Sequence, residues 1–328
     1  MEGVSLMSSV NQPKKSFLNS AAWTRFSIFY ALTFLLLIVI PVVHSLIADG
    51  PMDFDAAGAR ASATTGLAWT SNLWVVFRLC LAEPVLALVV FGSAVPSIAG
   101  LLVCIGRNGR VRELFSRFRV RIPWRVALKE YGLIFLVMVV GLSCAYALRS
   151  ALPGPEYERP AEFLGPGLVL ALLAAAFLDQ GAVLEELGWR GYALSELQEG
   201  LMNPLAAAVV IGVAWGLWHV PRDVTWGVVE RLGLLQYLLL YLPSFLAGTI
   251  TVSIIITYFV NRCGGSILPA IMIHGLNNDA VGFAGFAPLE IILSPMHQIT
   301  SALPFAVIAF VIVIKNGRQL GLNKHTTI

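Results

Sequence analysis

Four ionisable side chains within one largely apolar stretch are the first candidates for chemistry in this chain. Asp179, Glu185, Glu186 and Arg190 all fall between residues 179 and 192. Glu186 and Arg190 are four residues apart with the acid first, which on a helix is the favourable arrangement for an ion pair. Glu185 then points about 100° away from its neighbour. The spacing therefore predicts that the arginine holds Glu186 and leaves Glu185 free.

A carboxylate such as Glu185 can do work that a solvated one cannot. In a low-dielectric pocket a carboxyl group holds a proton more readily than in water, which suits a general base acting near neutral pH. The alternative interpretation is that Glu185 and Glu186 merely cap the end of an apolar helix.

Two histidines and an asparagine on the following apolar stretches strengthen the catalytic interpretation. His219 ends a run that starts near residue 204, and it lies as far after Met202 as Glu185 lies before it. In an antiparallel hairpin that turns near residues 200–203, Glu185 and His219 would face each other. This assumes that the first helix continues through residue 197. His274 and Asn278 are four residues apart and would share one helix face. Taken singly, each also fits plain packing or a hydrogen bond between helices.

The elements that must position these side chains are membrane helices. Apolar residues make up 57% of the 328 residues and charged residues 12%, against about 45–50% and about 25% in soluble domains. Runs long enough to cross a bilayer predict an all-α, polytopic bundle of about eight helices: 26–47, 84–105, 131–152, 165–188, 204–220, 236–260, 266–286 and 297–314. The net charge of +3 is too small and dispersed to indicate nucleic acid.

Charge bias orients the chain in the cell membrane. The expected parts are a polar tail (1–25), a first group of helices (26–164), a core with the polar motifs (165–287) and a last helix with its tail (288–328). Residues 107–129 form a basic segment, which is either a surface helix on anionic lipid or a cytoplasmic loop. The excess of Lys and Arg on one side predicts that both termini are cytoplasmic.

Three motifs in this order resemble those of a known family. They are Glu-Glu-x-x-x-Arg at 185–190, aromatic-x-x-x-His at 215–219 and His-x-x-x-Asn at 274–278. The pattern is similar to that of the CPBP family, which comprises type II CAAX prenyl endopeptidases and bacteriocin-processing or self-immunity proteins. Where the family usually has phenylalanine, this chain has Trp215. The resemblance covers about a third of the chain.

The resemblance implies an intramembrane endopeptidase that acts on a membrane-embedded or lipidated peptide or protein. Glu185 would activate water with help from His219, His274 and Asn278 would stabilise the oxyanion, and Glu186 and Arg190 would form a structural pair. A metal-free mechanism is favoured.

Three alternatives stay open beside that reading. Zn²⁺ held by Glu185, His219 and His274 would be a His₂Glu site. The buried acids and histidines could instead relay protons in a transporter, or the chain could be a non-catalytic bacteriocin self-immunity protein.

Overall fold

The protein is all-helical in the part that its computed structural model describes. That part comprises residues 20–47, 53–68, 70–106, 110–152, 167–199, 202–278 and 293–322. Within it the regular elements are helices, and the one β-type contact is an isolated bridge between Asn72 and Asp179. The predicted fold class is therefore confirmed.

Six of the described helical stretches are long and apolar enough to cross a membrane. They are Ala21–Ile47 in α1, Pro84–Ile105 in η1 and α4, Trp124–Ser150 in α6, Pro204–Thr225 in α10 and α11, Leu234–Arg262 in α13, η4 and α14, and Pro295–Gln319 in α18 and η5. Each corresponds to a predicted span. The expected count of eight is not confirmed, because one of the other two predicted spans is broken and the other is described only in part.

The predicted span 165–188 is two helices rather than one. Helix α7 (Gly167–Leu178) ends before Asp179, which has an extended backbone (φ −65°, ψ 124°). Helix α8 (Gln180–Glu186) starts anew because the Asp179 carboxylate accepts a hydrogen bond from the backbone N–H of Ala182 at 2.6 Å. An N-cap residue needs this non-helical conformation. The break also pairs with another segment, since the Gln180 N–H donates to the carbonyl of Ser71 at 2.7 Å.

The predicted span 266–286 is described only in its first half. Helix α15 (Leu268–Asn278) carries His274 and Asn278, and the rest of that span lies outside the described residues.

The helical hairpin expected around residues 200–203 is present. Helix α8 runs into the π-helix η3 (Leu187–Ala193) and then into α9 (Leu194–Glu199), so that the chain stays helical from residue 180 to 199. Helix α10 (Pro204–Trp218) begins with Asn203 as its N-cap. A π-turn displaces the usual backbone bonding, and here Ser97 of α4 compensates. Its hydroxyl donates to the carbonyl of Leu184 and accepts from the N–H of Gly188.

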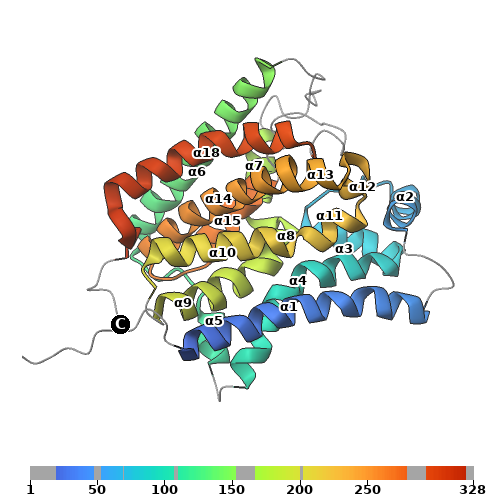
Figure 1. The fold of residues 1–328 in the computed structure, drawn as a ribbon, viewed down its shortest axis with the longest axis horizontal. Helices are drawn as coiled ribbons and strands as arrows, with labels where there is room; N and C mark the ends of the chain where they lie inside the picture. The colour runs from blue at the N-terminus through green and yellow to red at the C-terminus, as the bar shows by residue number, and fades with distance from the viewer. Residues whose placement is uncertain are drawn as a thin grey trace, which may run out of the picture.

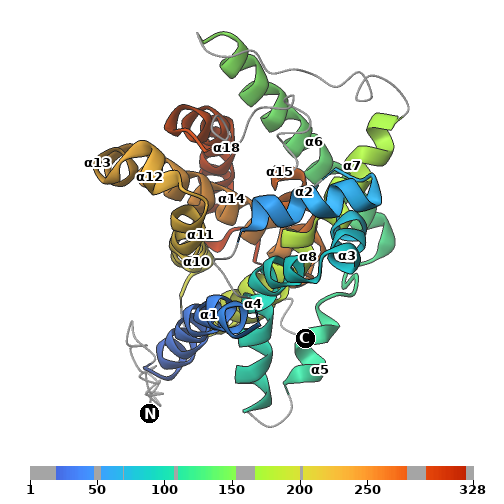
Figure 2. The same cartoon turned by 90° about the vertical axis from the view of Figure 1, so that its right-hand side faces the viewer.

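Helices α8 and α15 lie in the interior of the bundle (Figures 1 and 2). Helices α10, α14 (Leu242–Arg262) and α18 (Pro295–Asn316) pack in succession, while α1 (Ser20–Ile47) packs on α4 (Ala87–Ile105). Helix α15 contacts α7, α8, α14 and α6 (Trp124–Ser150). The two interior helices therefore carry two of the three polar motifs, and α10 carries the third at its C-terminal end.

Glycine permits the closest approach of the inner helices. A side chain on Gly275 would overlap the carbonyl oxygen of Ala175 in α7, and one on Gly188 would overlap the backbone of Pro96 in α4. Small residues at helix interfaces are typical of membrane bundles, because they let backbones approach closely. Here Gly275 and Gly188 lie close in sequence to His274 and Glu186, whose side chains link α15 to α8.

Short helices complete the described fold, and one of them lies in the basic segment. They are α2 (Phe54–Thr65), α3 (Leu73–Ala82), η1 (Pro84–Leu86), α5 (Val111–Ser116), α11 (Val220–Thr225), α12 (Val228–Leu232), α13 (Leu234–Gln236), η4 (Tyr237–Tyr241) and η5 (Gly317–Gln319). In the basic segment, Arg110 and Arg117 pair with the carboxylates of Glu113 and Glu199. The exposed basic residues there are Arg112, Arg119, Arg121, Arg125 and Lys129.

Candidate active site

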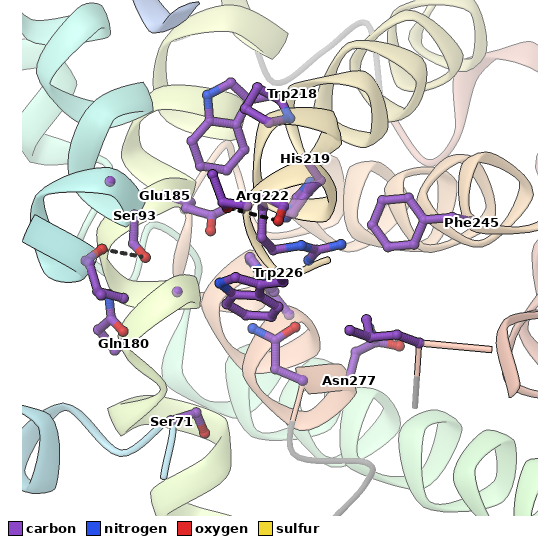
Figure 3. A pocket seen from close by; sticks show the side chains of 18 of the residues that line it. Ser71, Ser93, Gln180, Glu185, Trp218, His219, Arg222, Trp226, Phe245 and Asn277 are labelled. Carbon is purple, nitrogen blue, oxygen red and sulfur yellow. Dashed lines mark hydrogen bonds between the residues drawn. The ribbon is translucent and has the colours of Figure 1, made fainter. Parts of the chain in front are cut away.

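The four residues predicted to be catalytic all line one cavity. It has a volume of about 750 Å³, and Glu185, His219, His274 and Asn278 contribute to its wall together with residues of α1, α4, α6 and α18. Figure 3 shows Glu185 and His219 around the same space, with Trp218 and Asn277 beside them. Helices α8 and α15 and the C-terminal end of α10 thus bring their polar side chains to one cavity.

Glu185 is held by the indole of Trp215. The residue is 5% exposed, and its Oε2 accepts a hydrogen bond from Trp215 Nε1 at 2.9 Å. One carboxylate oxygen is therefore fixed from α10, while the group as a whole still borders the cavity. The prediction that Glu185 is free of the arginine agrees with the salt bridges, because Arg190 binds its neighbour.

Glu186 is the centre of a buried structural cluster. Its Oε1 accepts from Arg190 Nη1 at 2.7 Å and from His274 Nδ1 at 2.8 Å. Glu186 and Arg190 are both fully buried. The i,i+4 pair is present as predicted, and it has an additional partner that the sequence did not indicate, since Glu186 also holds the imidazole of α15.

Hydrogen bonding fixes which nitrogen of each histidine carries a proton. His219 Nδ1 lies 2.7 Å from the carbonyl oxygen of Trp215, and His274 Nδ1 lies 2.8 Å from the Glu186 carboxylate. Both partners are acceptors, so each Nδ1 must be the donor. In the neutral form each imidazole therefore keeps its lone pair on Nε2.

Asn278 is tied to the break between α7 and α8. Its Nδ2 donates to Asp179 Oδ1 at 3.0 Å, and the same oxygen caps α8. A side chain on Gly181 would lie 3.2 Å from Asn278 Nδ2 and 3.5 Å from Glu185 Oε1. The Asn278 amide and the Glu185 carboxylate thus border the same small space next to Gly181.

The comparisons with known proteins point to the same part of the chain. Residues 165–279 match the family model described as type II CAAX prenyl endopeptidase Rce1-like, and this range includes the four catalytic candidates. The chain is also 26% identical over 224 residues to a protein named CAAX prenyl protease 2 from Methanococcus maripaludis. That alignment covers 65% of this chain and 78% of the relative. These matches support an assignment to the intramembrane proteases of the CPBP family.

Two groups that border the active-site candidates of this protease were not assigned a catalytic role from sequence. From sequence, Asp179 stands out only as one of four ionisable residues in its stretch, and Trp215 only as the aromatic residue of the second motif. The position of Asp179 directly before Gln180-Gly181 was a usable signal, since aspartate is a strong N-cap residue. No signal in the sequence indicates that Trp215 donates to Glu185.

The donor set of the protease does not fit a metal ion. Among the described residues, no three His, Cys, Asp or Glu side chains are grouped so as to hold one. Zinc would require Glu185, His219 and His274 to converge within bonding distance.

Proposed function

We propose that this intramembrane protease hydrolyses a peptide bond with Glu185 as the general base. The convergence of Glu185, His219, His274 and Asn278 on one cavity is the observation that supports the proposal. A water molecule has two protons, and the pocket offers two acceptors for them, namely Glu185 and Nε2 of His219. A water held by both would direct a lone pair at a substrate carbonyl.

Peptide hydrolysis can proceed with Glu185 alone carrying the transferred proton. The water oxygen bonds to the carbonyl carbon as one water proton moves to Glu185. Glu185 then gives that proton to the leaving nitrogen as the C–N bond breaks. The second water proton stays on the new carboxyl group, and the products are an acid and an amine.

The oxyanion of the intermediate needs donors, which we assign to His274 and Asn278. Asn278 Nδ2 has a second N–H beyond the one bound to Asp179. His274 donates from Nε2 when it is doubly protonated, with its Nδ1 bonded to the Glu186 carboxylate. Stabilising the developing charge in this way is commonly the largest catalytic contribution in acyl transfer.

The substrate that we propose is lipidated or membrane-embedded. One wall of the cavity is apolar, with Phe34, Leu37 and Ile38 of α1 and Leu88 and Val89 of α4. Such a wall can take an acyl or prenyl chain while the polar end meets the peptide. The relative from Methanococcus maripaludis is named a CAAX prenyl protease, which makes a prenylated peptide the first substrate to test.

We also propose that the exposed arginines of the basic segment bind anionic lipid. Arg112, Arg119, Arg121 and Arg125 are exposed to solvent and form no salt bridge with an acidic side chain in the described part of the chain. Basic side chains near an anionic leaflet are each worth about 1 kcal/mol of binding.

Glu185→Gln tests the catalytic proposal directly. The purified variant in vesicles should fold and insert as wild type does, yet cleave a farnesylated CAAX peptide about 10²- to 10⁴-fold more slowly, which is the usual effect of losing a general base. Glu199→Gln is the matched control, because Glu199 lies on the same helical stretch but away from the cavity. Cleavage by Glu185→Gln at the wild-type rate would end the proposal, as would pH-dependent flux through wild-type vesicles without any proteolysis.

A further inference from the structure

An arginine lies in the cavity one helical turn beyond His219. Arg222 is on α11 and borders the same cavity as the catalytic candidates. Figure 3 shows its guanidinium in the space between His219, Trp226 and Phe245. Three residues of helix correspond to a rise of roughly 4.5 Å. A cation therefore stands next to the place where we propose that the peptide bond is cut.

The guanidinium is held in a defined orientation. Nε and Nη2 of Arg222 donate to a single oxygen of Asp223, at 3.0 and 2.6 Å. Asp223 is fully buried, and its other oxygen accepts from the Tyr237 hydroxyl at 3.0 Å. The aromatic rings of Trp226 and Phe245 lie 5.4 and 5.2 Å from the Arg222 Cζ. Ion pairing and cation–π contacts thus fix the arginine before any ligand arrives.

A donor remains available at this position. Asp223 engages the Nε and Nη2 edge of Arg222, and the side chain is still 27% exposed, so that Nη1 can serve another acceptor. The hydroxyl of Tyr241, a fully buried residue that also lines the cavity, lies beside the Arg222 guanidinium. A fixed arginine with a buried hydroxyl nearby is suited to an anion.

We propose that Arg222 binds the carboxylate at the C-terminus of the substrate, an inference that rests on the proposed peptidase function. A planar guanidinium pairs with a carboxylate more strongly than with a neutral amide. An extended peptide advances about 3.3–3.6 Å per residue, so a group bound by Arg222 lies only a few residues from the bond held at His219. The enzyme would thereby select bonds close to a free chain end.

The experiment compares two substrates that differ in one functional group. A farnesylated CAAX peptide is made with a free C-terminal carboxylate and with a C-terminal amide, and kcat and KM are measured for both in phosphatidylcholine vesicles. The variants are Arg222→Gln, Arg222→Lys and the control Arg231→Gln, in which an exposed arginine outside the cavity is changed.

Wild type and Arg231→Gln should cleave the acid with a kcat/KM about ten- to hundredfold above that of the amide, mainly through KM, because a hydrogen bond to a charged group has that magnitude. Arg222→Gln should lose this preference and cleave the acid and the amide with similar kcat/KM. Arg222→Lys, which keeps the charge but loses the planar fork, should fall between.

Equal cleavage of acid and amide by wild type would overturn the carboxylate assignment whether or not the variants fold, and would leave the peptidase proposal intact. The assignment also fails if Arg222→Gln keeps the preference for the acid. Repeating the assay with phosphatidylglycerol in the vesicles tests whether Arg222 binds an anionic lipid headgroup instead. If Arg222→Gln changes only the response to that lipid, the site binds a headgroup and not the substrate. If wild type cleaves neither peptide, the peptidase proposal itself fails.

Discussion

Replacing Trp215 by phenylalanine isolates one contact of the active site. The indole donates from Nε1 to Glu185, and its ring also packs against the Arg190 guanidinium at 4.6 Å and against the His274 ring at 4.8 Å. Phenylalanine keeps an aromatic face for the arginine and the imidazole but has no N–H. The substitution therefore removes the hydrogen bond to the base while leaving most of the packing in place.

The size of the effect follows from the charge on the acceptor. A hydrogen bond to an ionised group contributes about 1.5–3 kcal/mol, and each 1.36 kcal/mol in the barrier is a factor of ten in rate. If that bond holds Glu185 in position for the water, Trp215→Phe should lower kcat about ten- to hundredfold with little change in KM. The loss should be smaller than that of Glu185→Gln, which removes the base itself.

The assay is peptide cleavage in vesicles, with the thermal unfolding of each variant measured in detergent. Trp189→Phe is the matched control, because Trp189 is fully buried, does not line the cavity, and has an indole N–H without a partner among the described residues. Both variants make the same atomic change. If Trp189→Phe loses as much activity as Trp215→Phe, or if Trp215→Phe raises KM and leaves kcat unchanged, the positioning role of the indole is refuted.

Two further substitutions test how the fold places the site. Asp179→Ala should lower the free energy of unfolding by about 0.5–2 kcal/mol through loss of the α8 cap, and it should also reduce kcat because Asn278 loses its acceptor. Asp179→Asn keeps a capping oxygen and should restore most of the melting temperature. Equal melting temperatures of the two variants would contradict the capping role. Gly275→Ala should destabilise the protein by about 1–3 kcal/mol, the usual cost of overpacking, because the added methyl meets the Ala175 carbonyl, whereas Gly132→Ala on α6 meets no atom within 4 Å and should melt at or above the wild-type temperature.

Local spacing in the sequence was enough to predict the pairs that lie on one helix. The Glu186–Arg190 salt bridge follows from a separation of four residues, and it forms even though η3 adopts a π-helical turn. The meeting of Glu185 and His219 at one cavity could also be predicted, because it depends only on the position of the turn and on a continuous helix on each side. These predictions depend on distances along the chain, which a sequence contains.

Contacts between side chains of different helices could not be predicted from the sequence. That His274 would bond to Glu186, and Trp215 to Glu185, depends on how α15 and α10 rotate about their axes against α8. The rotation is fixed by close contacts between helices, such as that of Gly275 with the backbone of Ala175. The spacing of apolar residues along the sequence does not reveal such contacts. The prediction of a single span at 165–188 was wrong for a related reason. Hydropathy is insensitive to a cap, and the run stays apolar up to Asp179.

The two adjacent glutamates show why the site needs a buried ion pair. A lone carboxylate or arginine in this interior would cost several kcal/mol, yet Glu186 and Arg190 are both fully buried and bonded to each other. Their neutralised pair supplies a fixed acceptor for His274 Nδ1, which links α15 to the helix that carries Glu185. Glu185 itself has only the indole N–H of Trp215 as a bonded donor in the described residues. The difference in partners therefore assigns the structural role to Glu186 and leaves Glu185 able to exchange a proton with water in the cavity.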